Sequence, residues 1–351
     1  MNKFYSLTVE EIKPLTLDSV QILFNNKYPE EFGFKAGQYI TLRKEINNEE
    51  VRRSYSLSSS PGKGIEIGVK HVEKGLMSTF LTKDLKVGDV LDVLPPTGNF
   101  YLDTNNENKH YVAVCAGSGI TPILSMIRHI TEKEPNSDFT LIYGNRSRSS
   151  VMFGQELQKL ENDFQSQVFV YYAFSREKTS NFINGRIDEL VLKNLFHNSK
   201  NLASADAYFL CGPGEMIDTV NSFLVDLEIK QEKINFERFT ANIKQEKTKE
   251  ILSVPEEIVS NMIISVDGDD FEFQLSSKGK TILEAAMDEG ADVPFSCKGG
   301  VCCVCKAKVI QGEVSMDANY SLSEDEVAEG YILTCQSHPA SEDVVVDFDE
   351  I

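Results

Sequence analysis

Hydrophobic and polar residues alternate in short segments over the first 105 positions of the chain, and turn-forming residues separate the segments. Five segments have the length and alternation typical of half-buried β-strands, at residues 20–24, 38–42, 53–57, 65–69 and 90–93. Their close, regular spacing predicts a small antiparallel barrel over residues 1–105.

The pattern changes over residues 106–240, where apolar runs alternate with helical stretches. The apolar runs lie at residues 111–115, 139–143, 168–172 and 207–211. Apolar residues at helical spacing follow at 122–130 and 215–227. This alternation predicts a parallel sheet of α/β type that helices cover on both faces.

The rest of the chain divides into a polar stretch at 241–258, which we interpret as a linker, and a third region at 259–351. The capping-box pattern Ser323-Glu-Asp-Glu326 predicts a helical turn in this third region. The region also contains strand-like segments at 262–266, 271–275 and 344–348, and a longer helical segment at 282–287. We therefore expect a multidomain chain that combines α+β and α/β domains.

The net charge of −19 is concentrated in the third region. Residues 259–351 hold 19 acidic and 5 basic side chains, a charge of −14, whereas the other 258 residues together carry −5. Such a surface would repel phosphates, which argues against a nucleic-acid partner. It suits docking on a basic patch of another protein, although a merely solvated acidic surface fits the composition equally well.

The chain has no apolar run near the roughly 20 residues of a membrane-spanning helix. Its first residues also lack the apolar stretch of a secretory signal. We therefore expect a cytoplasmic protein with no membrane partner. Five of its seven cysteines lie in the last 55 residues. In a cytosolic chain, such clustering indicates metal or redox chemistry more often than disulfides.

The strongest chemical signal is the loop Cys297-Lys-Gly-Gly-Val-Cys302-Cys303-Val-Cys305, which is followed much later by Cys335. The spacing C-x4-C-x2-C…C is typical of plant-type [2Fe–2S] proteins. One tight loop can supply three thiolates only if its backbone wraps closely, which accounts for Gly299 and Gly300. A structural zinc site is the weaker alternative, because it pairs two short cysteine knuckles and Cys335 stands alone.

The segment from Met262 to Phe348 resembles a plant-type ferredoxin domain of the β-grasp fold. The resemblance implies that four cysteines bind a [2Fe–2S] cluster, namely Cys297, Cys302, Cys305 and Cys335. Cys303 is then a packed fifth thiol or an alternative ligand. Backbone N–H groups of the loop would bond to the cluster sulfurs and tune the reduction potential.

The segment Arg53-Ser54-Tyr55-Ser56-Leu57-Ser58 contains the residue types of a flavin site. An arginine pairs with a pyrophosphate, a tyrosine ring stacks on a flavin, and a serine can bond to a ring nitrogen. The segment resembles the R-x-Y-S-x-[ST] motif of the ferredoxin–NADP reductase superfamily. This resemblance implies an FAD-binding β-barrel in which Arg53, Ser54, Tyr55, Ser56 and Ser58 contact FAD. The alternative is an amphipathic strand with a chance tyrosine.

Two further segments resemble parts of the same flavin site. Gly75-Leu-Met77-Ser78 resembles the segment that holds the FAD phosphates at a helix start, where free N–H groups favour an anion. The resemblance implies that Gly75, Met77 and Ser78 contact the cofactor. Pro95–Phe100 resembles the family's barrel-closing turn. His71, where many relatives carry arginine, is either a contact of the FAD adenosine or an exposed strand histidine.

The segment from Cys115 to Pro122 follows an apolar strand and opens a helical stretch. Thr121 is expected to be the N-cap and Pro122 the first helical residue, so that a pyrophosphate could bind at the helix start. The segment resembles the superfamily's G-x-G-x-x-P loop. This resemblance implies that Gly117, Gly119 and Thr121 bind the nicotinamide dinucleotide.

Two later motifs extend the resemblance. Cys211-Gly212-Pro213 resembles the superfamily's C-G-P motif, whose cysteine lies beside the reactive nicotinamide, although a buried cysteine before a turn would look the same. Gly212 and Pro213 would contact the dinucleotide. Phe236-Glu-Arg-Phe239 resembles the terminal strand of the family, so that Phe239 either covers the flavin or is a core residue.

The segment Tyr143-Gly-Asn-Arg146-Ser147-Arg148 bears on the choice of dinucleotide. NADH sites often place an acid on the ribose 2′-hydroxyl, whereas NADPH sites need cations and hydroxyls for the 2′-phosphate. No acid follows this apolar run directly, and Arg146, Ser147 and Arg148 take its place. The segment therefore predicts NADPH over NADH.

The order of flavin, nicotinamide and ferredoxin segments resembles the reductase components of bacterial multicomponent oxygenases, and among them the reductase subunits of phenylacetyl-CoA epoxidases. The resemblance implies an oxidoreductase that moves electrons from NAD(P)H through FAD and the cluster to an oxygenase docked on the acidic domain. Ser56 and Cys211 would position the two reacting rings. The alternatives are a reductase for a Rieske or steroid oxygenase, and a non-catalytic nucleotide-binding protein with a structural metal.

Overall fold

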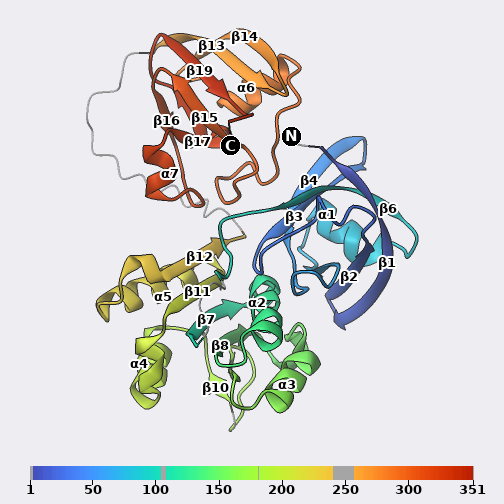
Figure 1. The fold of residues 1–351 in the computed structure, drawn as a ribbon, viewed down its shortest axis with the longest axis vertical. Helices are drawn as coiled ribbons and strands as arrows, with labels where there is room; N and C mark the ends of the chain where they lie inside the picture. Colours follow the sequence, from blue (N-terminus) through green and yellow to red (C-terminus); the bar gives the residue numbers. More distant parts are fainter. Residues whose placement is uncertain (1–2, 104–107, 181, 240–256, 351) are drawn as a thin grey trace. The chain divides into compact units, whose positions relative to one another are not determined.

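The computed structural model describes residues 3–103, 108–180, 182–239 and 257–350, and its elements are drawn in Figure 1. The chain divides into two compact units. One is Phe4–Phe239, and the other contains the C-terminal residues from Thr240 onward. The predicted linker at 241–258 lies almost entirely outside the described residues.

The first half of the larger unit is a six-stranded antiparallel sheet with the strand order β4-β3-β6-β1-β2-β5. A bridge between Leu57 and Ile67 joins its two edges, which closes the sheet as the predicted barrel. Its strands are β1 (Tyr5–Thr16), β2 (Ser19–Asn25), β3 (Tyr39–Ile46), β4 (Glu49–Ser56), β5 (Ile65–Lys70) and β6 (Val90–Thr97). Between β5 and β6 the chain forms the short helices α1 (Leu76–Thr79) and η1 (Phe80–Asp84).

The second half is a six-stranded parallel sheet with the order β10-β9-β8-β7-β11-β12. Its strands are β7 (His110–Ala116), β8 (Asp138–Asn145), β9 (Val168–Phe174), β10 (Ile183–Asn184), β11 (Ala207–Gly212) and β12 (Ile234–Arg238). The helices are η2 (Gly117–Gly119), α2 (Ile120–Lys133), η3 (Arg148–Ser150), α3 (Gly154–Asp163), α4 (Glu189–Asn198), η4 (Lys200–Ser204), α5 (Gly214–Asp226) and η5 (Gln231–Lys233).

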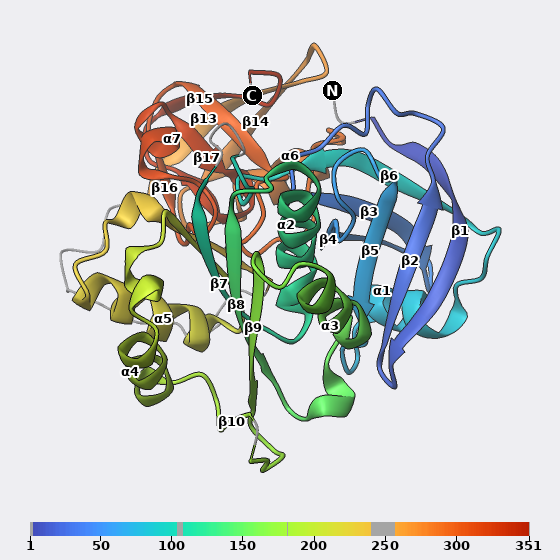
Figure 2. The same ribbon diagram turned by 60° about the horizontal axis from the view of Figure 1, so that its bottom comes forward.

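Helices cover both faces of the parallel sheet, as predicted. Figure 2 shows α2 and α3 on one side of the strands and α4 and α5 on the other. Each face has its own core: one joins Leu124 and Leu157 to the sheet, and the other joins Leu192 and Leu224 to it. The strands are apolar on both faces because each is buried twice.

The C-terminal unit is a mixed five-stranded sheet with the order β14-β13-β19-β15-β17. Its strands are β13 (Val259–Val266), β14 (Asp269–Ser276), β15 (Lys306–Gln311), β17 (Tyr331–Leu333) and β19 (Asp343–Asp347), with the separate pair β16 (Val314–Met316) and β18 (Ser337–Pro339). The helices are α6 (Ile282–Asp288), α7 (Glu324–Ala328) and η6 (Thr334–Gln336). Ile282 and Leu283 of α6 share one core with Met262 of the sheet. The predicted capping box at Ser323 and Glu326 is present.

The predicted elements are present, but β1, α3, α4 and several shorter elements of the larger unit had no predicted counterpart. The first strand, β1, contains Pro14 and shows register shifts against β2, so its alternation is irregular. Helices α3 and α4 were not predicted from the sequence. Within the described residues, no helix is both long and apolar enough to cross a bilayer.

Candidate functional site

Ser56, Glu237 and Cys211 come together within the larger unit. Ser56 is the last residue of β4, and its hydroxyl donates to the Glu237 carboxylate over 3.2 Å. Glu237 lies on β12, directly beside Cys211 of β11 in the parallel register. The barrel and the parallel sheet therefore share one polar site, to which each contributes a residue.

Glu237 is a partly buried acid, and among the residues that the structure describes no cation pairs with it. Burial raises the pKa of Glu237 to about 8, although the hydrogen bond from Ser56 lowers it in part. Arg238 is adjacent in sequence, but successive strand residues point to opposite faces, and Arg238 pairs with Asp218 of α5. From the sequence, only the aromatic residues of this segment were expected to have a role. The signal that could have revealed Glu237 is an acidic residue within the strand that pairs with the strand of the predicted catalytic cysteine.

The residues of the flavin motif differ in their exposure. Arg53 is exposed, and its guanidinium donates to the main-chain oxygen of Arg52 over 2.7 Å. Tyr55 is partly buried, and burial raises the pKa of its hydroxyl well above the usual range. The Ser54 hydroxyl lies 3.0 Å from that of Thr41.

Ser58 makes a hydrogen bond within the barrel. Its side chain is fully buried, and its hydroxyl donates to the Glu66 carboxylate over 2.7 Å. The hydroxyl keeps its acceptor lone pairs, so the predicted flavin contact of Ser58 stays a prediction.

The second flavin segment forms a tight turn ahead of α1. The Ser78 hydroxyl accepts from the main-chain N–H of Val72 over 3.1 Å, and Gly75 is the N-cap of α1. The Met77 side chain packs in the barrel core, so only its backbone is available for a ligand. His71 Nε2 lies 3.3 Å from the Thr79 hydroxyl, which gives this histidine a local structural contact.

The predicted dinucleotide loop joins β7 to α2. Its helix begins two residues earlier than predicted: Gly119 is the N-cap, and Ile120 is the first residue of α2. Thr121 is therefore not the N-cap; its hydroxyl donates to the Ser118 carbonyl over 3.0 Å within the first turn. Gly117 has φ +58°, a conformation that glycine adopts without strain.

The dinucleotide loop presses against the Cys211 turn. A Cβ atom at Gly119 would lie 2.2 Å from the Cys211 carbonyl oxygen, a distance that no side chain allows. Gly212 also approaches Ala116 closely, with its Cβ position 3.1 Å from the Ala116 nitrogen, and Gly212 has φ +152°. These contacts bring the two predicted dinucleotide motifs together at the carboxyl ends of neighbouring strands.

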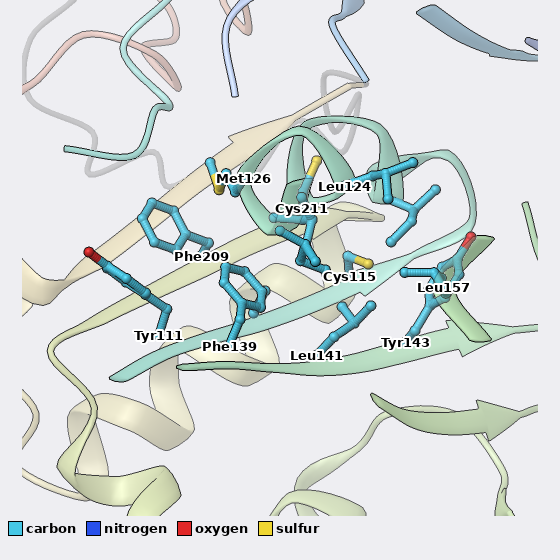
Figure 3. Close-up of a cluster of buried hydrophobic side chains, with 14 of the residues drawn as sticks. Tyr111, Cys115, Leu124, Met126, Phe139, Leu141, Tyr143, Leu157, Phe209 and Cys211 are labelled. Atoms are coloured by element: carbon cyan, nitrogen blue, oxygen red, sulfur yellow. The ribbon is translucent and has the colours of Figure 1, made fainter. Parts of the chain in front are cut away.

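Cys115 and Cys211 are partners on β7 and β11, on the face that α2 covers (Figure 3). Both side chains are fully buried. Burial raises the pKa of each thiol well above its usual range, so both remain protonated at neutral pH. Cys211 therefore offers a small neutral group beside the Ser56–Glu237 pair and not a reactive thiolate.

The arginine segment after β8 lies beside an acid that the sequence analysis missed. Arg148 pairs with Glu177: its Nε lies 3.1 Å from Oε1, and its main-chain N–H donates to Oε2 over 2.8 Å. Glu177 follows β9, and the main-chain N–H of Arg176 donates to the Arg146 carbonyl over 2.9 Å. The parallel pairing of β8 and β9 therefore places this acid, which is distant in sequence, beside the predicted cations.

The four predicted cluster cysteines lie together in the C-terminal unit. The Cys302 and Cys297 sulfurs are 3.1 Å apart, and Cys335 is hydrogen-bonded to both Cys297 and Cys305. The Cys302 and Cys335 thiols hold the pKa of Cys297 well below its usual range, which favours the thiolate that binds metal.

The four sulfurs form a row of neighbours: Cys297 lies next to Cys302 and Cys335, and Cys335 lies next to Cys305. Cys303 faces elsewhere: its thiol donates to the Ser321 carbonyl over 3.3 Å, and burial raises its pKa to about 11. The structure therefore favours Cys303 as the packed fifth thiol.

The loop around the sulfurs is held by hydrogen bonds to its backbone. The Gly300 carbonyl accepts from the main-chain N–H of Tyr320 over 3.0 Å, and the main-chain N–H of Gly299 donates to the Cys297 sulfur over 3.3 Å. Gly300 has φ +70°, and a Cβ there would lie 3.1 Å from the Ala318 carbonyl. Four thiols with a backbone donor fit the donor set of a [2Fe–2S] cluster.

Comparison with known families matches three domain descriptions to this chain. They are the oxidoreductase FAD-binding domain at residues 6–101, the oxidoreductase NAD-binding domain at 113–222, and the 2Fe-2S iron-sulfur cluster binding domain at 264–340. The chain is therefore an oxidoreductase with FAD-binding, NAD-binding and [2Fe–2S] domains. These matches contradict the alternative of a non-catalytic protein with a structural metal.

The chain belongs to the family of the E subunit of 1,2-phenylacetyl-CoA epoxidase. It is 40% identical to that protein of Escherichia coli (strain K12) over 99% of both chains. It is also 31% identical to NADH oxidoreductase HCR of the same strain, over 92% of this chain and 90% of that one. The ferredoxin reductase component of 3-ketosteroid-9-alpha-monooxygenase from Rhodococcus rhodochrous is 27% identical over 97% and 96% of the two chains.

A solved structure confirms the multidomain fold. Phthalate dioxygenase reductase, described as a modular structure for electron transfer from pyridine nucleotides to [2Fe–2S], matches with a TM-score of 0.61 and 26% identity. The match covers 98% of each chain. The predicted fold class is therefore correct for the whole chain.

Two cysteine variants test the cluster ligands. Cys297→Ser removes a sulfur at the centre of the row, and we expect it to lose most of the iron and acid-labile sulfide. Cys303→Ser is the matched control, since this thiol bonds to a carbonyl and faces away from the other sulfurs. Its iron and sulfide content should equal that of the wild type. Equal loss in both variants would contradict the assignment of Cys303.

The raised pKa of Glu237 predicts a pH dependence of stability. Between about pH 4.5 and about pH 8, Glu237 is protonated in the folded state and ionised in the unfolded state. Its contribution to stability is therefore lost as the pH rises to about 8. In Glu237→Gln, the fall in melting temperature from pH 6 to pH 9 should shrink by at least about 3 °C. An identical fall in both proteins, measured by thermal unfolding, would refute the raised pKa.

Proposed function

We propose that this chain is the reductase component of a phenylacetyl-CoA epoxidase system, which passes electrons from NADPH through FAD and a [2Fe–2S] cluster to the oxygenase. One observation carries the proposal: the similarity to the E subunit of 1,2-phenylacetyl-CoA epoxidase extends over 99% of both chains. When bound, the three groups would supply one chemistry, in which the two electrons of a single hydride from the nicotinamide would leave the flavin one at a time through the cluster.

The residues around FAD divide by what they offer to the cofactor. Arg53 provides a permanently charged donor for a phosphate, and Tyr55 provides a partly buried ring for stacking. Ser56 presents a hydroxyl that Glu237 orients. We assign contacts with the remainder of the cofactor to Ser54, His71, Gly75, the backbone of Met77, and Ser78.

The dinucleotide would bind at the carboxyl ends of the parallel strands. We assign its pyrophosphate to the α2 start with Gly117, Gly119 and Thr121, where first-turn N–H groups face outward. Gly212 and Pro213 line the neighbouring turn, and Cys211 would lie beside the nicotinamide. Catalysis by Ser56 and Cys211 is then placement of two rings, since the cofactors carry the chemistry.

NADPH is the proposed dinucleotide. Arg146, Arg148 and Arg176 lie at the ends of β8 and β9, and all three are exposed. Ser147 contributes a hydroxyl that lies 3.0 Å from that of Ser149. One acid, Glu177, opposes them. We infer that the 2′-phosphate competes with Glu177 for Arg148 and that the excess of cations favours the phosphate.

The acidic C-terminal unit is the proposed docking surface for the oxygenase. Its charge of −14 favours a basic partner surface and steers the encounter. We place the four ligands at Cys297, Cys302, Cys305 and Cys335 and the domain limits at 1–105, 106–240, 241–258 and 259–351. The proposed compartment is the cytoplasm, because a thiolate-bound cluster needs reducing surroundings.

The oxygenase partner is tested by reconstitution under NADPH. We expect turnover with phenylacetyl-CoA epoxidase subunits and at least about tenfold less with the oxygenase of a steroid monooxygenase, whose reductase component is 27% identical. Equal or greater turnover with the second oxygenase would reject the proposed pathway.

The relay through the cluster is tested in the same assay. Cys297→Ser should reduce a small dye within about twofold of the wild-type rate, because this reaction needs only the flavin. It should deliver no measurable electrons to the oxygenase. Cys303→Ser should retain both activities. If Cys297→Ser supports oxygenase turnover at the wild-type rate, the cluster is not on the electron path.

A single substitution tests the dinucleotide preference. Glu177→Gln removes the acid that holds Arg148, and should raise the ratio of kcat/KM for NADPH to that for NADH by about three- to tenfold, as expected for a partly exposed ion pair. Glu232→Gln is the control, because it breaks the exposed pair with Lys230 at the opposite end of the sheet. A wild-type preference for NADH, or an unchanged ratio in Glu177→Gln, would overturn the proposal.

A further inference from the structure

One face of helix α2 carries polar residues whose side chains contact other parts of the protein. Thr121, Ser125, Arg128 and Glu132 follow one another at intervals of four, three and four residues, which places them on one face of the helix. Thr121 and Ser125 are buried. All four contact the barrel, so this face forms a polar boundary between the two halves of the larger unit.

The barrel side of this boundary is the serine run that continues from the flavin motif. The Ser125 hydroxyl donates to the Ser59 carbonyl over 2.5 Å, and the Ser60 hydroxyl donates to Glu132 over 3.1 Å. These serines begin shortly after Ser56, so the helix that carries the dinucleotide loop is bonded directly to the segment that carries the flavin motif.

Arg128 is at the centre of the boundary and makes three short contacts. Its Nη1 donates to the Ser58 carbonyl and to Glu66 Oε1, each over 2.6 Å, and its Nε donates to Glu156 Oε1 over 2.6 Å. The side chains of Arg128 and Glu66 are only 17% and 12% exposed, so solvent screens this pair weakly. One guanidinium thereby connects α2, α3, β5 and the end of the flavin-motif strand.

Glu66 is also held by hydrogen bonds from within the barrel. Its carboxylate accepts from Gln21 of β2 and from the Ser58 hydroxyl. Two positions further along β5, Gly68 leaves room for the helix: a Cβ there would lie 2.7 Å from Thr121 Cγ2 and 2.9 Å from Phe153 Cε2. The barrel thus presents a rigid acceptor at Glu66 and a gap at Gly68.

We propose that Arg128 is a positioning residue for hydride transfer. This inference rests on the proposed function, in which the hydride, with its electron pair, leaves the nicotinamide carbon and binds the flavin. Arg128 is seven residues past Thr121, about 10 Å along the helix axis. Its bonds to Glu66 and Ser58 therefore set the distance between the dinucleotide loop and the flavin strand. Misplacement by about 1 Å can slow such a reaction about 100-fold.

The test compares two conservative substitutions with a matched control. Arg128→Lys keeps the charge but loses the planar fork, and Glu66→Asp keeps the charge but withdraws the carboxylate by one methylene. Arg43→Lys is the control, because Arg43 pairs with Asp92 inside the barrel over 3.1 Å. All variants are the full chain with FAD and cluster bound.

Anaerobic stopped-flow mixing with NADPH gives the limiting rate of flavin bleaching and the dissociation constant of NADPH. We expect Arg128→Lys and Glu66→Asp to lower the limiting rate about 10- to 100-fold, with the dissociation constant changed by less than about threefold. Arg43→Lys should match the wild type. An unchanged rate in both test variants overturns the proposal, as does a rate loss matched by lost affinity or an equal loss in Arg43→Lys.

Amide hydrogen exchange provides a second measurement that needs no dinucleotide. Exchange at residues 57–68 and 120–133 should quicken in Arg128→Lys and not in Arg43→Lys, because the contact that holds these segments together is weakened. Unchanged exchange overturns the positioning role. If neither NADPH nor NADH reduces the wild-type flavin, the proposed function fails, and exchange alone then decides whether Arg128 holds the two halves together.

Discussion

The structure depends on a close approach of helix α2 to two neighbours, which only glycine allows. At Gly119 the helix start meets the Cys211 turn, and at Gly68 the helix side meets the barrel strand β5. A side chain at either position would clash with the atoms opposite, which belong to the backbone or to the packed Thr121 and Phe153, so the helix would have to move away. The dinucleotide motifs and the flavin motif are adjacent because these two positions carry no side chain.

Charge in the larger unit is arranged around that contact. Arg128 is paired with Glu66 and Glu156, so its burial at the boundary between barrel and sheet is compensated. Glu237 has no such partner among the described residues, and its pKa rises to about 8 as a result of burial. The paired cation holds elements together, whereas the unpaired acid lies where two cofactors are proposed to meet. Perturbed acids are characteristic of such reactive sites.

The C-terminal unit brings four sulfurs together on a small sheet. Three come from one loop, and the fourth follows β17, which pairs with β15 directly after the loop. The Thr334 hydroxyl and main-chain N–H both donate to the Cys305 carbonyl, at 2.9 and 3.1 Å, which ties Cys335 to the loop. The ligand set therefore depends on strand pairing as much as on the loop spacing.

The sequence by itself determined the order of the domains, the strand and helix pattern of each, and the cysteine spacing, because these are local properties of the chain. It did not determine which residues meet across elements. Glu237 and Arg238 are neighbours in sequence but point to opposite faces, Glu177 reaches Arg148 only through the pairing of β8 with β9, and Ser58 turns its hydroxyl inward to Glu66. Such contacts follow from register and packing between distant segments, and only the tertiary structure decides them.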